Sequence, residues 1–189
     1  MLYDGNVHTS LLKYPEIADR LIVLDGWSKT YAMTGWRMGY AIVPDWLVKA
    51  YSQLIINTIS GVTAFAQAGG IEALRGPQDE VEAMVREFDA RRNLIVDGLN
   101  EIPGCRCAKP QGAFYVFPDI SCAFGKSHGG KKIANDVDFC SVLLEAKGVA
   151  CVPGSAFGEP RAMRISYTCP TEQLPKGLQR IQEFFAELS

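Results

Sequence analysis

The sequence predicts an α/β protein. Short, β-branched apolar runs typical of buried strands alternate along the chain with segments in which apolar residues recur every three or four positions, as in amphipathic helices. The 189 residues are 48% hydrophobic and 21% charged, which is the composition of an ordinary folded protein. A chain of this length can bury a core in one or two domains.

The first predicted elements are two strands and a helix. The apolar run 21–24 lies between Arg20 and the turn-forming pair Asp25-Gly26, and predicts a buried strand. A polar, glycine-containing segment over 27–37 leads to a second predicted strand at 38–43, which ends at Pro44. A helix is expected to begin near Asp45, because apolar residues recur with helical spacing from there.

A long amphipathic helix is expected from Asp79 to about Asn100. Its apolar positions recur at three- and four-residue steps, and Pro103-Gly104 follows it. The second half then predicts strands over 113–117, 149–152 and 162–167, a helix over 139–147 that Gly148 ends, and a closing helix over 174–188. The glycine- and lysine-rich stretch 127–132 predicts a mobile surface loop.

Charge and cysteine content exclude several classes of function. Nineteen Lys and Arg oppose twenty-one Asp and Glu, so no global attraction to nucleic acid or to an anionic membrane is expected. The chain shows no targeting segment and no membrane-spanning apolar run, which predicts a cytoplasmic protein. The six cysteines form no Cys-x-x-Cys pair, and they predict reduced, buried thiols and no metal site.

Two basic residues between the first two predicted strands are candidates for chemistry. Lys29 lies just beyond the end of the first strand, where ligands bind in open α/β sheets, although position alone favours an ordinary solvated lysine. Arg37 lies between Trp36 and the second strand, where a fixed guanidinium could bind a phosphate through two hydrogen bonds. A reactive amine and a phosphate-binding arginine together suit a phosphorylated cofactor that carries an aldehyde.

The segment Ser28 to Tyr40 closely resembles the cofactor-lysine signature of the class I/II pyridoxal-phosphate-dependent aminotransferases. Residues 110–118 and 148–158 look like the small-domain segments of that family, in the same order, and 163–167 looks like its substrate-binding strand. The resemblance implies the fold of PLP-transferases of type I, with pyridoxal 5'-phosphate as cofactor. It also implies transfer of an amino group between an amino acid and a 2-oxo acid.

The resemblance also implies roles for individual residues. Lys29 would bind the cofactor covalently and move a proton at the substrate Cα, and Arg37 would bind the cofactor phosphate. Ser28 would be a further phosphate ligand, although a plain turn serine fits its position equally well. Arg164 would bind the substrate α-carboxylate, whereas an arginine in a strand, taken alone, is more simply explained by an ion pair.

Part of the family's active site has no counterpart in this sequence. Relatives carry an upstream stretch that supplies a glycine-rich turn, a ring-stacking aromatic residue and an aspartate for the pyridine nitrogen. The expectation is therefore a carboxyl-terminal half, with residues 1–90 forming the end of the large cofactor-binding domain and 91–189 the small α/β domain. We expect such a chain to form a homodimer or to associate with the missing amino-terminal half, because its apolar faces would otherwise be uncovered.

Two alternatives to an aminotransferase stay open. A pyridoxal-phosphate-dependent lyase would use the same cofactor, although the form of the segment Thr34 to Arg37 disfavours it. A catalytically silent fragment is favoured by the missing upstream half. One subgroup of dicarboxylate-specific relatives brings a second arginine from the segment that corresponds to Asn57 to Gln67, which holds no Arg or Lys here. This disfavours that route to aspartate specificity without excluding aspartate.

Overall fold

The computed structural model describes all residues, 1–189. The chain divides into two compact units, Val7–Met84 and a second unit formed by Met1–Asn6 with Val85–Ser189. The division falls inside helix α3 (Asp79–Asn100). The bounds of this helix confirm the long helix that the sequence predicts from Asp79 to about Asn100. Both units combine strands and helices, so the α/β class is confirmed.

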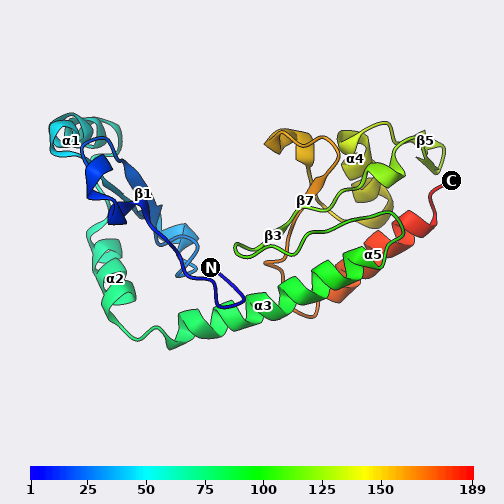
Figure 1. Ribbon diagram of the computed structural model, residues 1–189, viewed down its shortest axis with the longest axis horizontal. Helices are drawn as coiled ribbons and strands as arrows, with labels where there is room; N and C mark the ends of the chain where they lie inside the picture. The colour runs from blue at the N-terminus through cyan, green and yellow to red at the C-terminus, as the bar shows by residue number, and fades with distance from the viewer. The chain divides into compact units, whose positions relative to one another are not determined.

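The first unit, blue to green-cyan in Figure 1, is built on an antiparallel ribbon of two strands. Strand β1 (Val23–Gly26) pairs with β2 (Gly39–Ile42) so that Gly26 lies opposite Gly39. The helices α1 (Asp45–Ile59) and α2 (Ala64–Arg75) follow. Three short 3-10 turns complete the unit: η1 (Leu11–Lys13), η2 (Pro15–Ile17) and η3 (Thr34–Trp36).

The prediction of a buried strand over 21–24 is wrong in position and in burial. The strand begins at Val23 and continues to Gly26, because the glycine lets the partner strand approach closely: a Cβ there would lie 2.9 Å from the carbonyl oxygen of Met38. Leu24 is 73% exposed, since a ribbon of only two strands leaves a face uncovered. Apolar composition indicated the strand but could not show what covers it.

Helix α2 was not predicted, whereas α1 begins at Asp45 as expected. Two consecutive glycines, Gly69 and Gly70, lie in the middle of α2, and glycine lowers helix propensity by about 1 kcal/mol relative to alanine. The unit's small core explains why the helix forms nevertheless. Buried Ala66 of α2 packs in one cluster with Met33 and Met38.

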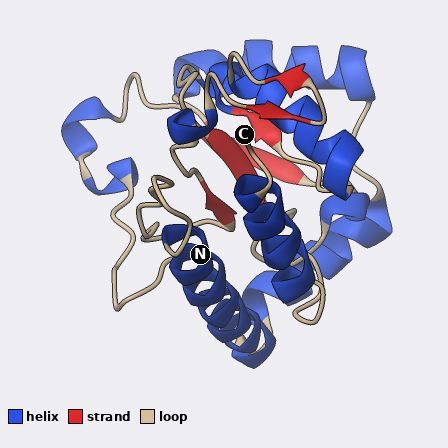
Figure 2. Cartoon of the chain, turned by 90° about the vertical axis from the view of Figure 1, so that its right-hand side faces the viewer, coloured by secondary structure: helices blue, strands red, loops and turns tan.

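The second unit contains a three-stranded antiparallel sheet, whose short strands are among those drawn in red in Figure 2. The strands β3 (Tyr115–Val116), β7 (Met163–Ser166) and β6 (Val152–Pro153) lie side by side in that order. Helix α5 (Leu174–Ala186) lies along the second half of α3 (Figure 1), and a Cβ at Gly98 would come within 2.1 Å of Leu178. The remaining elements are η4 (Ser121–Ala123), α4 (Asp136–Lys147) and η5 (Gly154–Phe157).

The prediction of a mobile loop over 127–132 is wrong. These residues form a hairpin in which β4 (Ser127–His128) pairs with β5 (Lys131–Lys132), and Gly129 and Gly130 both adopt positive φ in the turn. Ser127 also exchanges two backbone hydrogen bonds with Ser189, of 2.8 and 3.0 Å. The hairpin is therefore tied to the end of the chain, a contact that local sequence cannot reveal.

Three of the six thiols are buried, as the sequence predicts, namely those of Cys105, Cys107 and Cys140, whereas Cys122, Cys151 and Cys169 are half-buried. All six cysteines are free, and burial raises the pKa of both Cys105 and Cys151 to about 12. A raised pKa lowers the fraction of thiolate at pH 8, and the thiolate is the reactive form. We expect iodoacetamide to modify half-buried Cys169 well before Cys105 and Cys151, as followed by peptide mass spectrometry. Equal rates for the native chain would contradict this expectation, and equal rates in urea serve as the control.

No helix of the chain combines the length and the apolar character needed to cross a membrane. No group of three or more His, Cys, Asp or Glu side chains is arranged to hold a metal ion.

Candidate active site

The loop over residues 27–38 carries Ser28, Lys29 and Arg37, and it leaves the β1–β2 ribbon at the end where Gly26 pairs with Gly39. Because Gly26 pairs with Gly39, the two ends of the loop lie side by side on neighbouring strands. Lys29 follows Gly26 by three residues and Arg37 precedes Gly39 by two, so chain connectivity keeps the amine and the guanidinium in one loop. Both side chains are exposed, and Ser28 is half-buried.

Lys29 lies in a turn that its own backbone stabilises. The amide of Tyr31 donates to the carbonyl of Trp27 at 3.2 Å, and the amide of Ala32 donates to the carbonyl of Lys29 at 3.4 Å. Ala32 follows with a positive φ of 53°, which is uncommon for a residue other than glycine. The turn thus presents the amine at the surface of the loop.

Arg37 adopts a left-handed backbone conformation, with φ 55° and ψ 46°. Its side chain donates one hydrogen bond to the carbonyl of Thr34, at 3.1 Å, which uses one of the five N–H groups of the guanidinium. The residue also lines a cavity of about 710 Å³ together with Trp36, Thr63 and Phe65. Arg37 can therefore present further donors to an anion within the first unit.

Tyr40 of β2 lies next to this loop, and its position along the chain did not distinguish it from an ordinary packing residue. It pairs with Asp25 across the ribbon, and its hydroxyl donates to that carboxylate at 3.4 Å. Its ring meets Trp27 edge to face at 5.3 Å between centroids. Removal from water, followed by the negative charge of Asp25, raises the pKa of Tyr40. The phenol is thus held protonated beside the loop.

Arg164 belongs to the second unit, on β7, where two aromatic rings hold its guanidinium. The ring of Phe157 lies 4.3 Å and the ring of Tyr115 lies 4.6 Å from the guanidinium carbon. Tyr115 is placed by the sheet, because it pairs with Ser166, two residues beyond Arg164 on the same face of β7. The simple ion pair that the sequence left open is not formed.

The two aromatic rings were missed by sequence reasoning, since nothing in strand alternation marks Tyr115 or Phe157 as neighbours of Arg164. Phe157 reaches the arginine because the chain turns sharply at Gly154, where a Cβ would lie 2.3 Å from the carbonyl oxygen of Glu159. Cation–π contacts with two rings restrict the guanidinium, and its N–H groups can still donate hydrogen bonds along the edge of the plane. Such an edge is suited to a carboxylate, which it can bind through two parallel hydrogen bonds.

Comparison with known proteins identifies the family. The family model described as aminotransferase class I and II matches residues 3–181. The crystal structure of the aspartate aminotransferase from Rhizobium meliloti superposes with a TM-score of 0.95 and 42% identity, covering 100% of this chain and 48% of that one. An aromatic aminotransferase from Pyrococcus horikoshii OT3 superposes with a TM-score of 0.89 and 34% identity, over 98% of this chain and 48% of that one.

Relatives found by sequence also match nearly the whole of this chain but less than half of their own length. The probable aspartate/prephenate aminotransferase of Rhizobium leguminosarum bv. phaseoli is 46% identical over 171 residues, which are 90% of this chain and 43% of that protein. The chain thus spans less than half the length of the relatives it matches. The structural neighbours also confirm the fold of PLP-transferases of type I. From the match along nearly its whole length, the chain belongs to the class I and II aminotransferases, a pyridoxal-phosphate-dependent family.

Proposed function

We propose that this chain contributes cofactor- and substrate-binding residues to the transfer of an amino group between an amino acid and a 2-oxo acid. The observation that carries the proposal is the loop over 27–38, which presents the exposed amine of Lys29 and the exposed guanidinium of Arg37 at one end of the ribbon. Membership of the aminotransferase family supports the same reaction.

The donor set of this loop fits pyridoxal 5'-phosphate. The phosphate is an anion that a guanidinium and a hydroxyl can bind, which gives Arg37 and Ser28 their roles, and Arg37 faces a cavity. Lys29 supplies the primary amine that an aldehyde requires. When bound, this cofactor supplies an aldehyde and a ring that accepts electrons.

The chain's own residues then perform two tasks. The amine of Lys29 would hold the cofactor, and it would also move a proton at the Cα of the substrate, since an amine placed there can act as a general base. Arg164 binds the α-carboxylate and orients the substrate, because its planar edge allows two parallel hydrogen bonds.

The names of the relatives make aspartate the best candidate for the amino acid. Because 57–67 contains no Arg or Lys, recognition of a second carboxylate would rely on other residues. An aromatic substrate is the alternative that the Pyrococcus horikoshii neighbour suggests.

We assign this chain to the carboxyl-terminal half of the family fold, with 1–90 as the end of the large domain and 91–189 as the small domain. Coverage of 43 to 48% of the relatives supports this assignment. Exposed apolar side chains on the first unit support association with the amino-terminal half or with a second copy; among them are Leu24, Trp46, Leu54, Ile56 and Phe65. The same coverage favours, as a second candidate, a chain that binds the cofactor without turnover.

Covalent trapping tests the proposal. The chain is incubated with pyridoxal phosphate, the new C=N bond is reduced with borohydride, and the modified lysine is identified by mass spectrometry. We expect an adduct concentrated at Lys29 and lost in Lys29→Ala, because only Lys29 shares a loop with Arg37. Labelling spread evenly over surface lysines would contradict the site. In an amino-transfer assay with 2-oxoglutarate we expect little or no turnover from the chain alone, and robust turnover would overturn the need for a second half.

A further inference from the structure

The loop that carries Lys29 and Arg37 rests on two adjacent glycines of α2. A Cβ added at Gly69 would lie 2.7 Å from Cζ3 of Trp36. A Cβ added at Gly70 would lie 3.0 Å from Cε of Met38 and 3.2 Å from Cε2 of Trp27. Carbon atoms in favourable contact are about 3.5 to 4.0 Å apart, so only glycine allows these side chains to sit so close to the helix.

Trp27 adds a polar contact to this packing. Its indole Nε1 donates a hydrogen bond of 3.0 Å to the carbonyl oxygen of Gly70. Trp27 is the first residue after β1 and precedes Lys29 by two residues. The entry of the loop and its exit are therefore both attached to the same two residues of α2.

The exit of the loop contains the strained residue. Trp36 and Met38 are the immediate neighbours of Arg37, whose φ of 55° costs a non-glycine residue on the order of 1 to 2 kcal/mol. Such a conformation persists when surrounding contacts determine it, and it often occurs at functional sites. Here those contacts are Trp36 on Gly69 and Met38 on Gly70.

The two glycines also lower the stability of helix α2. Each one weakens the helix by about 0.5 to 1 kcal/mol relative to alanine. We propose that Gly69 and Gly70 are positioning residues, which set the place of Arg37 relative to Lys29 and thereby make the loop prefer an aldehyde that carries a phosphate. This inference rests on the proposed function of Lys29 and Arg37.

A pair of ligands separates positioning from general stability. Pyridoxal phosphate and pyridoxal present the same aldehyde to Lys29, but only the first has a phosphate for Arg37. For Gly69→Ala we expect trapping of pyridoxal phosphate at Lys29 to need about tenfold more ligand, the equivalent of one charge-assisted hydrogen bond. We expect trapping of pyridoxal to change less than about twofold, a change of about 0.4 kcal/mol. General disruption of the unit would instead weaken both reactions alike, and that result would overturn the proposal.

Three further variants complete the test. Gly177→Ala, in α5 with no neighbour within 4 Å of the added Cβ, is the matched control and should leave the preference unchanged. Gly70→Ala faces the flexible end of Met38 and should give a smaller loss than Gly69→Ala, which keeps the test usable if the latter folds poorly. Trp36→Phe removes the outer ring that meets Gly69, so combining it with Gly69→Ala should restore most of the preference.

The outcomes distinguish two kinds of failure. If the unmodified chain shows no phosphate-dependent labelling of Lys29, the proposed function itself is wrong and this inference falls with it. If the unmodified chain prefers pyridoxal phosphate to pyridoxal and Gly69→Ala retains this preference, the loop binds the phosphate without help from the glycines. Only the positioning role is then overturned. A double variant that recovers nothing would likewise contradict the contact between Trp36 and Gly69.

Discussion

Replacing Arg92 by methionine is expected to lower the free energy of unfolding of the second unit by about 1.5 to 3 kcal/mol, because the hydrogen bonds of a buried charged group are lost. Arg92 of α3 is fully buried, and its guanidinium binds both carboxylate oxygens of Asp4, at 2.7 and 2.8 Å. It also donates to Asp89 at 2.5 Å and to the carbonyl of Pro110 at 2.8 Å. Methionine keeps the apolar stem but leaves two carboxylates without their cation.

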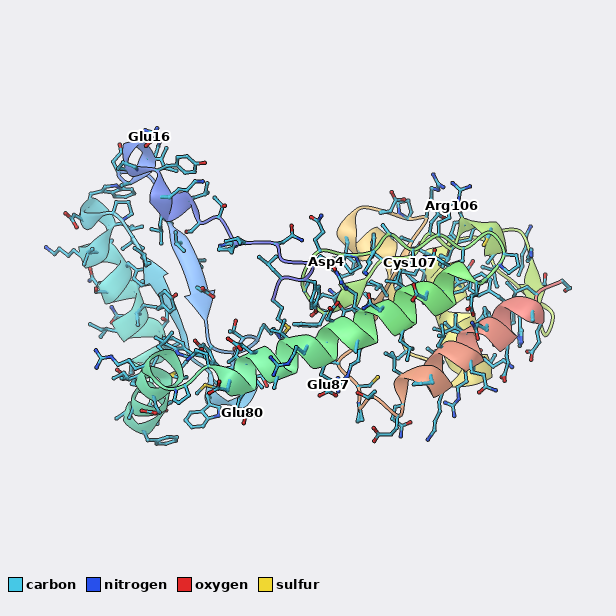
Figure 3. All side chains as sticks on the ribbon, turned by 60° about the horizontal axis from the view of Figure 1, so that its bottom comes forward. Asp4, Glu16, Glu80, Glu87, Arg106 and Cys107 are labelled. Atoms are coloured by element: carbon cyan, nitrogen blue, oxygen red, sulfur yellow. The ribbon has the colours of Figure 1, made fainter.

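The same variant should release the first six residues of the chain. Figure 3 shows Asp4 beside α3, and Tyr3 stacks under Arg92 at 4.3 Å while its amide donates to the carbonyl of Gln111. Urea unfolding measures the loss of stability, and limited proteolysis measures release of the amino terminus. Arg161→Met is the control, because this arginine is 65% exposed and its ion pair with Asp119 should contribute less than about 1 kcal/mol. An equally small effect of Arg92→Met would contradict the role of the buried charge.

The Arg92→Met substitution should also change how the free energy of unfolding depends on pH in acid. The hydrogen bond from Arg92 is the main cause that lowers the pKa of Asp4 in the folded chain. A carboxyl with a lowered folded pKa stabilises the fold above its unfolded pKa of about 3.9, and this stabilisation is lost as pH falls through the folded value. In Arg92→Met the difference between the two pKa values shrinks. Stability should therefore fall less steeply below about pH 4 than in the unmodified chain.

Replacing Arg37 by glycine is expected to separate stability from cofactor binding. Glycine accepts the left-handed conformation of residue 37 without strain, so the free energy of unfolding should stay the same or rise by up to about 1 kcal/mol. Loss of the guanidinium removes the proposed phosphate ligand. Trapping of pyridoxal phosphate at Lys29 should then require at least about tenfold more ligand, because charge-assisted hydrogen bonds contribute about 1.5 to 3 kcal/mol.

Ala32→Gly provides the matched control for this experiment. Ala32 lies in the same loop and also has a positive φ, of 53°, but its side chain offers no donor to an anion. Ala32→Gly should change thermal unfolding as little as Arg37→Gly does. It should not weaken the trapping of pyridoxal phosphate at Lys29. If Arg37→Gly trapped pyridoxal phosphate as well as Ala32→Gly does, Arg37 would not be a phosphate ligand.

Local sequence was sufficient for most helices and for the loop with the candidate site. Apolar spacing predicted α1, α3, α4 and α5, since each helix carries its own periodic pattern. Gly148 ends α4 in a left-handed conformation, as expected of a glycine that caps a helix. Lys29 and Arg37 are eight residues apart in one loop, so chain connectivity alone limits the distance between them.

Other features depend on residues that are distant in sequence. Helix α2 was not predicted, and its two adjacent glycines have a low helix propensity, yet Trp36 packs against Gly69 and Trp27 donates a hydrogen bond to Gly70. The hairpin at 127–132 depends on Ser189, and the attachment of Asp4 depends on Arg92. In each case a weak local preference is overridden by a contact that only the folded chain makes.

The sequence by itself determined the family, the class of fold and the residues of the candidate site. All three can be recognised from short segments in which the order of the residues is sufficient. Only the tertiary structure decided how the site residues are held. It placed Arg164 in contact with Tyr115 and Phe157, and it placed the neighbours of Arg37 against Gly69 and Gly70. These contacts join separate strands and helices, and close packing between elements depends on shape in three dimensions, which periodicity in one dimension does not encode.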